Sequence, residues 1–257
     1  MRVLFGPPRD FDPTVLDGMA LVDDDPDVWI VDPCANYIID GGRLDKYPSL
    51  QILATPSTGN NHIDLNAVQQ RGIKFLSLLD DRKGLNEISA SAEYTLMLLL
   101  AALRYAPPRE LQGRTIGLVG YGRIGRRMAR WCQTMGANVI AHDPPKRKNV
   151  SLEVLFDIAD AVVVCCTLND QTRGMITANV INLLPKFGRL VNTARGEIVE
   201  LDGIRDDIIV ASDFPHERAN ISSPHIAGAT WDSRTKATRI IRKLVEREWN
   251  KQRGIVA

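Results

Sequence analysis

Apolar residues occur along this chain in short blocks with two kinds of spacing. Blocks of consecutive apolar residues bounded by Gly, Pro or Asp are typical of buried strands and occur at residues 2–6, 28–32, 50–55, 74–78, 115–119, 138–142, 161–166, 189–192, 208–212 and 221–225. Apolar residues three and four positions apart predict helices at residues 64–70, 86–105, 124–135, 151–158, 177–184 and 231–252. Because strands that alternate with helices form parallel sheets covered by those helices, the pattern predicts an α/β fold.

The glycines of GYGRIG stand between a predicted strand and a predicted helix, and the next strand is followed by Asp143. In a dinucleotide-binding turn, Gly120 allows the sharp bend, Gly122 lets a pyrophosphate reach the backbone, and Gly125 lets the helix pack on the strand. The free N–H groups and the positive dipole end of the helix favour that anion. The sequence therefore predicts a doubly wound, Rossmann-type domain.

Asp143 indicates which dinucleotide binds. It lies 18 residues after Gly125 and can accept hydrogen bonds from a ribose diol, whereas its charge repels a 2′-phosphate. NAD is therefore favoured over NADP. Lys146, Arg147 and Lys148 follow Asp143 closely and keep NADP as an alternative.

The glycine turn begins only at residue 120, so a substantial part of the chain precedes it. Four predicted strands in that part indicate a separate lobe with a small parallel sheet of its own. The predicted helix at residues 86–105 is apolar nearly all round, which indicates burial on more than one side. Two interpretations stay open: a helix between two domains that also contributes to a dimer surface, or a core helix of one lobe.

Composition narrows the class of protein. The 257 residues are 44% apolar and 25% charged with a net charge of +1, which predicts a soluble globular protein and no nucleic-acid or anionic-membrane partner. The longest apolar run, residues 96–103, is too short to cross a bilayer, and MRVLFGPPRD lacks the layout of a signal peptide. The four cysteines show no metal-ligand spacing, so we expect no metal and a reducing, cytoplasmic location.

Three further segments place polar residues at the ends of predicted strands, where open α/β sheets bind their ligands. LVNTARGEIV carries Arg195, whose planar guanidinium suits a carboxylate or a carbonyl oxygen. ASDFPHER carries Asp213 and Glu217, and SSPHIAGAT carries His225. A carboxylate beside a histidine stabilises the imidazolium, so that the ring exchanges a proton with an oxygen near neutral pH.

These candidates have structural alternatives. An arginine in a turn is often only a solvated surface residue. Most lone histidines are structural, which is our interpretation of His62, His142 and His216. His216 stands beside Glu217 and is the alternative to His225 for a catalytic role.

Several motifs then follow one another in a recognisable order: LATPSTGNNHIDL, ASAEYTLMLLLAALR, LQGRTIGLVGYGRIG, CTLNDQT, LVNTARGEIV, ASDF and SPHIAGAT. With these motifs, over about residues 50–230, the chain resembles the D-isomer-specific 2-hydroxyacid dehydrogenase family, which includes D-3-phosphoglycerate, glyoxylate/hydroxypyruvate and D-lactate dehydrogenases. Several motifs in register are far more specific than the glycine turn alone.

The resemblance implies an NAD-dependent oxidoreductase that interconverts 2-hydroxy and 2-keto acids of D configuration. It implies that Arg195 binds the substrate carboxylate and carbonyl, that His225 is the general acid/base, and that Glu217 pairs with His225. Thr58 and Gly59 match a loop whose N–H groups hold the substrate carboxylate. The expected cofactor contacts are Gly120, Gly122, Arg123, Ile124, Gly125, Asp143, Thr167, Thr193, Asp213 and Gly228.

The resemblance also implies a domain organisation and a homodimer. In the family, a helix from the end of the chain returns to the N-terminal lobe. Residues 1–85 plus 231–257 would then form a discontinuous, flavodoxin-like substrate lobe, and residues 86–230 the NAD-binding Rossmann domain. Asp213 matches the aspartate that contacts the nicotinamide carboxamide. The expected partner is a small 2-hydroxy or 2-keto acid.

The chain departs from the family by shorter connections. Residues 194–207, 14 in all, join two predicted strands where the family has a crossover helix, and this length is near the lower limit for parallel strands. Only eight positions separate Glu217 from His225, fewer than in relatives, and Arg218 stands where the family usually has proline. These differences bear on the pairing of Glu217 with His225 more than on the NAD site.

Two alternatives to this function stay open. Transcriptional corepressors share the scaffold, so the chain could be an NAD(H)-sensing binding module with weakened catalysis. The same fold with another substrate would oxidise formate or phosphite. Substrate identity depends in the family on the N-terminal lobe, here around residues 33–36 and 57–60, and the sequence does not predict it.

Overall fold

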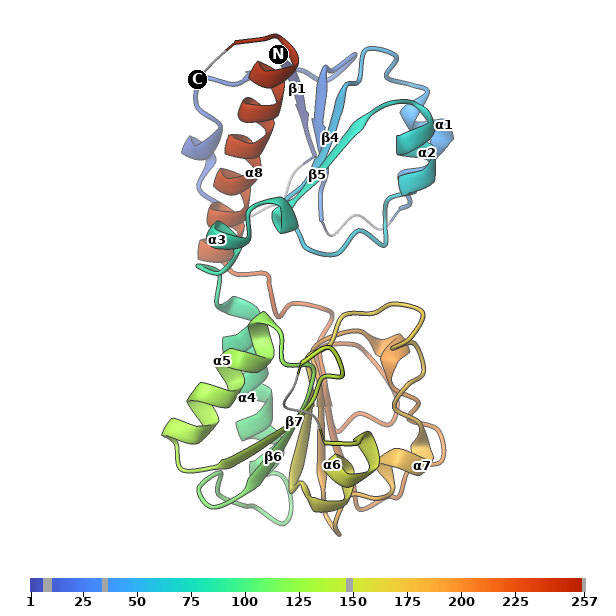
Figure 1. Cartoon of the computed structure of the whole chain (residues 1–257), viewed down its shortest axis with the longest axis vertical. Coiled ribbons are helices and arrows are strands. Elements are labelled where there is room, and N and C mark those ends of the chain that lie inside the picture. Colours follow the sequence, from blue (N-terminus) through green and yellow to red (C-terminus); the bar gives the residue numbers. More distant parts are fainter. Residues whose placement is uncertain (7–10, 34–36, 147–149, 256–257) are drawn as a thin grey trace. The chain divides into compact units, whose positions relative to one another are not determined.

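The computed structural model describes residues 1–6, 11–33, 37–146 and 150–255 (Figure 1). The chain divides into two compact units, which we call unit 1 (Met1–Ile88 with Ala229–Ala257) and unit 2 (Ser89–Gly228). Each unit contains one sheet whose described strands are all parallel. The prediction of an α/β fold built from parallel sheets is confirmed.

Unit 1 has a five-stranded sheet in the order β2-β1-β3-β4-β5. This order is the flavodoxin-like one that was predicted for the smaller lobe. The strands are β1 (Arg2–Phe5), β2 (Ala20–Leu21), β3 (Val28–Ile30), β4 (Ile52–Thr55) and β5 (Lys74–Ser77). The helical elements are η1 (Pro13–Leu16), α1 (Gly41–Leu44), α2 (Leu65–Gln70), η2 (Leu78–Asp80), α3 (Arg82–Leu85) and α8 (Trp231–Gln252).

Alternation along β3 explains how the sheet of unit 1 is covered. Val28 and Ile30 belong to the apolar cluster that contains Ile241 and Val245 of α8, whereas Trp29 belongs to the cluster on the α1 and α2 side. Figure 1 accordingly shows α8 on one face of this sheet and α1 and α2 on the other. The C-terminal helix therefore buries its apolar stripe in the core of unit 1.

Unit 2 has a six-stranded sheet in the order β11-β10-β9-β8-β6-β7. Its strands are β6 (Thr115–Val119), β7 (Asn138–His142), β8 (Ala161–Val164), β9 (Arg189–Asn192), β10 (Ile209–Ser212) and β11 (Ile221–Ser222). Its helical elements are α4 (Ala90–Arg104), α5 (Arg123–Thr134), α6 (Leu152–Ile158), α7 (Ala178–Ile181) and η3 (Gly196–Ile198). The chain runs from β6 to β7 and then returns to β8 on the other side of β6. Such a reversal of strand order is where open α/β sheets bind ligands.

Two apolar clusters cover the faces of this sheet. Alternate residues of β6, Ile116 and Leu118, pack in the cluster that includes α4 and α5. Val119 packs in the cluster that includes α6, α7 and the segment after β9. Figure 1 shows α4 and α5 together on one face and α6 and α7 on the other. Helices on both faces make this a doubly wound sheet, as the sequence predicts.

Some predicted elements differ from the observed ones. The helix predicted at residues 86–105 begins only at Ala90, and the strand predicted at residues 221–225 ends at Ser222 because the following segment turns back onto Asp213. Between β9 and β10 the described chain forms only the short η3 turn. The shortened connection therefore joins these parallel strands without an α-helix in its described residues.

Candidate active site

The glycine turn after β6 leaves room for a ligand at one position and none at the others. Gly120 has φ +97°, and a Cβ there would lie 2.6 Å from the backbone N of Cys166. A Cβ on Gly125 would lie 2.2 Å from the carbonyl oxygen of Gly120. A Cβ on Gly122 would meet no atom within 4 Å. Gly120 and Gly125 therefore shape the turn, and Gly122 faces open space, as a pyrophosphate requires.

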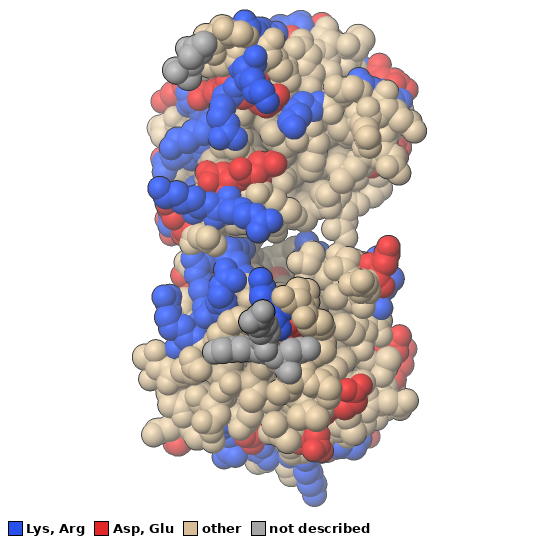
Figure 2. Space-filling view, viewed as in Figure 1, with Lys and Arg blue, Asp and Glu red and all other residues tan. Residues whose placement is uncertain are grey.

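The start of α5 has no side chain of its own to satisfy its backbone donors. Gly122 is the N-cap and provides no side-chain hydrogen bond. Over the described residues, the N–H groups of Ile124 and Gly125 at the start of this helix donate to no protein acceptor and are available to an anion. Figure 2 shows Lys and Arg side chains over the part of unit 2 that contains α5, where Arg126 and Arg130 are exposed. Burial lowers the pKa of Arg123, and the nearby charge of Arg127 lowers it further.

Asp143 follows β7, and its side chain connects the end of that strand to the glycine turn. Its Oδ2 accepts a hydrogen bond from the Tyr121 N–H at 2.6 Å. This contact brings the carboxylate to the turn, next to the open face of Gly122. The turn, the uncapped helix and the carboxylate together fit the pyrophosphate and ribose of NAD. Arg147 and Lys148, part of the argument for NADP, lie outside the described residues.

Thr193, directly after β9, has a hydroxyl with a defined orientation. Its Oγ1 lies 2.7 Å from Oγ1 of Thr95, and both side chains are buried. The Thr95 hydroxyl gives its single proton to the carbonyl of Ser91 at 2.6 Å. Thr193 is therefore the donor to Thr95, and its oxygen keeps acceptor capacity at the edge of the sheet. Of the other expected cofactor contacts, Ile124 packs partly in the core, and Thr167 and Gly228 are exposed.

Arg195 extends from the loop after β9, which Asn192 holds in shape. The Asn192 side chain donates to the Arg195 carbonyl at 2.8 Å and accepts from the Ala194 N–H at 3.0 Å. Sequence reasoning missed Asn192, although an amide at the end of a buried strand is a usable signal. Burial lowers the pKa of Arg195, while the charges of Glu197 and Asp213 raise it. The guanidinium remains charged at every physiological pH.

His225 is held in an uncommon conformation near Arg195. Its φ is +57°, its N–H donates to the carbonyl of Asp213 at 2.9 Å, and the Phe214 ring lies 4.9 Å from its own ring. Burial lowers the pKa of His225; the charge of Arg195 lowers it further, and the charge of Asp213 opposes both. The structure thus brings Arg195, Asp213 and His225 together at the carboxyl edge of the unit 2 sheet.

Glu217 is exposed on the loop between β10 and β11. Within the described part of the chain, no hydrogen bond joins it to His225, and it is not among the charges that shift the pKa of His225. On the same loop, His216 accepts a hydrogen bond from the Arg218 N–H through Nδ1 at 3.1 Å. The contact of His225 that the structure describes is with Asp213.

Thr58 and Gly59 lie in unit 1, in the loop after β4. The Ser57 hydroxyl lies 3.0 Å from the Thr55 hydroxyl and donates to the Gly59 carbonyl at 2.6 Å, which fixes the loop. Over the described residues, the N–H groups of Thr58 and Gly59 donate to no protein acceptor. Free N–H groups in a fixed loop are suited to an anion. Residues 34–36, where substrate contacts were also expected, lie outside the described residues.

The described cysteines are packed side chains. Burial raises the pKa of Cys132 and of Cys166 to about 11, and it raises the pKa of Cys165 as well. A thiol that stays protonated is a poor nucleophile and a poor metal ligand. Among the described residues, no group of three His, Cys, Asp or Glu side chains could hold a metal ion. In that same part of the chain, no helix is long and apolar enough to cross a membrane.

Comparison with solved structures agrees with the fold. The chain resembles NAD⁺-bound 3-phosphoglycerate dehydrogenase of Entamoeba histolytica with a TM-score of 0.84, at 21% identity and over 98% of this chain and 96% of that one. It resembles NAD-dependent formate dehydrogenase of Staphylococcus aureus in complex with NAD with a TM-score of 0.78, at 22% identity and over 98% of this chain and 96% of that one.

Comparison with curated proteins gives closer sequence relatives. The chain is 31% identical to erythronate-4-phosphate dehydrogenase of Hahella chejuensis over 224 residues, 77% of this chain but only 57% of that protein. It therefore spans little more than half the length of this relative. It is 30% identical to (S)-sulfolactate dehydrogenase of Chromohalobacter salexigens over 240 residues, 76% of each chain.

A family model provides the remaining evidence. Residues 84–208 match the NAD-binding domain of the D-isomer specific 2-hydroxyacid dehydrogenases, which confirms NAD as the predicted cofactor. This match includes the glycine turn, Asp143 and Arg195. Together with the identity to the sulfolactate dehydrogenase over three quarters of both chains, it establishes that the chain belongs to the D-isomer specific 2-hydroxyacid dehydrogenase family.

Proposed function

We propose that this protein is an NAD-dependent oxidoreductase that transfers a hydride between NAD(H) and a small 2-hydroxy or 2-keto acid of D configuration. The observation that carries the proposal is the convergence of Arg195 and His225 at the carboxyl edge of the unit 2 sheet, where the charge of Arg195 acts on the His225 ring. A permanent cation and a titrating imidazole are the two groups that a 2-keto acid needs for binding and for proton transfer.

The chain's own residues hold the cofactor and the substrate. NAD(H), when bound, accepts or supplies the hydride. The N–H groups at the start of α5 bind the pyrophosphate at Gly122, Asp143 accepts from the ribose hydroxyls, and Thr193 offers an acceptor oxygen at the sheet edge. Arg195 binds the substrate carboxylate and polarises its carbonyl. His225 donates a proton to the carbonyl oxygen during reduction and removes it during oxidation.

Unit 1 is proposed to be the substrate lobe, with boundaries close to the predicted residues 1–85 plus 231–257, and unit 2 the NAD-binding domain. The free N–H groups of Thr58 and Gly59 support a role in holding the substrate carboxylate. The pairing of Glu217 with His225 stays a prediction, since no contact in the described structure supports it. A location in the cytoplasm likewise stays a prediction.

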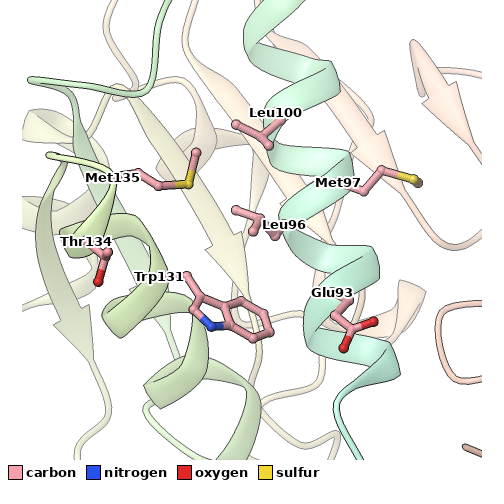
Figure 3. Close-up of a pocket in the computed structure, with 7 residues that line it drawn as sticks. All are labelled: Glu93, Leu96, Met97, Leu100, Trp131, Thr134 and Met135. Carbon is pink, nitrogen blue, oxygen red and sulfur yellow. The ribbon is translucent and has the colours of Figure 1, made fainter.

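A homodimer is also proposed, through an apolar hollow of about 500 Å³ between α4 and α5. Figure 3 shows Leu96 and Leu100 of α4 facing Trp131 and Met135 across this hollow. Met97 on its α4 side is 49% exposed. Contiguous apolar surface of this kind is characteristic of a protein interface. A second copy covering it would bury the exposed part of α4.

Oxidation of NADH by a set of acceptors tests the proposed function. We expect the full-length chain to oxidise NADH, measured by absorbance and fluorescence, when glyoxylate, hydroxypyruvate or another small 2-keto acid is added. Formate and phosphite with NAD⁺ serve as the comparison reactions. Binding of NADH without turnover of any acceptor would contradict the enzyme assignment and favour an NAD(H)-sensing binding module.

A further inference from the structure

Asp213 makes more contacts than a cofactor-binding side chain requires. It is 1% exposed and directly follows β10. Its Oδ1 accepts from the Ser223 hydroxyl and from the Ile226 N–H, each at 2.8 Å, and its Oδ2 accepts from the Ala227 N–H at 2.9 Å. Its carbonyl accepts the His225 N–H at 2.9 Å. One residue therefore holds four donors of the segment that carries His225, and we call this set of hydrogen bonds the Asp213 clamp.

The segment depends on the clamp for its shape. His225 has φ +57°, in the left-handed region that residues with a side chain rarely adopt, so this conformation needs support from the surrounding structure. The Asp213 clamp holds the Ser223 side chain before this position and the Ile226 and Ala227 N–H groups after it. The preceding strand β11 contains only two residues, Ile221 and Ser222, and offers little further support.

The Ser223 hydroxyl completes the clamp. Without it, Oδ1 of Asp213 would keep one donor, the Ile226 N–H, and the carboxylate would be fixed from the side of Ile226 and Ala227 alone. Asp213 and Arg195 are the charges that act on the His225 ring, and Phe214 packs against it. The orientation of the ring therefore depends on how firmly Asp213 is held.

We propose that Ser223 is a positioning residue for proton transfer: its hydroxyl completes the Asp213 clamp, which holds the His225 backbone in its left-handed conformation and aims the imidazole at the substrate oxygen. This inference rests on the proposed dehydrogenase function. It assigns to Asp213 and Ser223 the orienting role that the family resemblance assigns to Glu217.

The test compares Ser223→Ala with Ser222→Ala in the full-length protein. Both variants lose one hydroxyl from neighbouring residues, but the exposed Ser222 side chain makes no hydrogen bond within the described structure. Because misplaced acid/base groups slow the chemical step, Ser223→Ala should lower kcat for 2-keto acid reduction about tenfold. KM and the Kd of NADH should change less than about twofold. Ser222→Ala should match the wild type, and Ser223→Thr, which keeps a hydroxyl, should recover most of kcat.

Amide hydrogen exchange provides a readout independent of activity. The Ile226 and Ala227 amides should exchange about tenfold faster in Ser223→Ala than in the wild type. In Ser222→Ala, their exchange rates should equal those of the wild type. Ser223→Cys, with a weak donor of similar size, replaces the alanine variant if that variant does not fold. The proposal would be overturned if Ser223→Ala kept the wild-type kcat and the wild-type amide exchange rates. It would also be overturned if Ser222→Ala showed the same losses as Ser223→Ala. If the wild type reduces no 2-keto acid, the proposed function fails, while amide exchange still decides whether Ser223 holds the segment.

Discussion

The acid/base candidate His225 lies in surroundings that favour its neutral form. Burial and the charge of Arg195 lower its pKa, and the opposing charge of Asp213 does not compensate. A neutral imidazole is ready to accept a proton from a hydroxyl group. The protonated form, which reduction of a carbonyl requires, is populated only at lower pH.

A pH dependence follows from this shift. The general acid must carry its proton for reduction, so kcat/KM for the 2-keto acid should fall as pH rises through a pKa below the ordinary value of 6.5. The measurement is the pH profile of kcat/KM at saturating NADH. A decrease of kcat/KM centred above pH 6.5 would contradict a lowered pKa of His225. In His225→Gln, this decrease should be absent.

At Gly120 of the turn, both the backbone conformation and the lack of space exclude a side chain. Its φ is +97°, and a Cβ would lie 2.6 Å from the backbone of Cys166, so Gly120→Ala must displace the turn. We expect this variant to weaken NADH binding at least about tenfold, measured by fluorescence titration. Gly113→Ala is the control, because Gly113 has φ +76° but no atom within 4 Å of a Cβ. Equal NADH affinity in the two variants would argue against this account of the turn.

The sequence predicts single residues of the site unevenly. The glycine turn and Asp143 are predictable because their chemistry follows from spacing along one continuous segment. The nearness of Asp213 to His225 is not, because it depends on a short loop folding back after β11 and on a left-handed backbone at a histidine. Thr95 was missed since its contact with Thr193 joins residues 98 positions apart.

At the scale of elements, the end of α4 is joined to the sheet by a buried arginine. Arg189 of β9 is fully buried, and its guanidinium donates to the carbonyls of Ala102, Tyr105, Pro107 and Phe187. The Ala102 carbonyl belongs to the last turn of α4, those of Tyr105 and Pro107 to the segment after it, and that of Phe187 to the segment before β9. Carbonyl groups at the end of a helix lack N–H partners within the helix, so the Arg189 guanidinium provides hydrogen-bond donors for them.

Removal of this arginine should destabilise unit 2. Arg189→Met keeps most of the side-chain volume but leaves buried carbonyls without donors, which should lower the free energy of unfolding by about 3 kcal/mol. Urea denaturation measures the loss. Arg173→Met is the control, because Arg173 is exposed. A loss no greater than that of the control would show that the Arg189 bonds contribute little.

Long helices and buried strands are predictable from apolar spacing, whereas the exposed strand β2 and the one-turn helices α1 and α3 are not. The core strand β6 and the helix α5 lie close to their predicted bounds because each repeats its pattern over several residues. The short elements β2, α1 and α3 were not predicted, since two to four residues carry too little periodicity. α4 packs on β9 and β10, which supports the core-helix interpretation of residues 86–105, while its exposed Met97 keeps the dimer interpretation open.

At the scale of the whole molecule, the apolar hollow on unit 2 predicts the oligomeric state. A second copy should cover it, so the wild type should have twice the chain mass of 28.5 kDa in light scattering after gel filtration. Met97→Glu places a charge in the hollow and should give the single-chain mass. Val154→Glu is the control, because Val154 is 48% exposed on α6 and does not line the hollow.

The dimer proposal fails in either of two cases. A wild-type mass of 28.5 kDa would mean that the hollow does not bind a second copy under these conditions. A Met97→Glu variant that keeps the doubled mass would place the interface elsewhere.

The most direct test of the whole account is a comparison of His225→Gln with the wild type in NADH binding and in NADH oxidation by a 2-keto acid. We expect the variant to bind NADH with wild-type affinity, because the glycine turn and Asp143 are intact, and to lose about 10²- to 10⁴-fold in kcat. Full turnover by His225→Gln would contradict the proposal that this imidazole, next to Arg195, moves the proton.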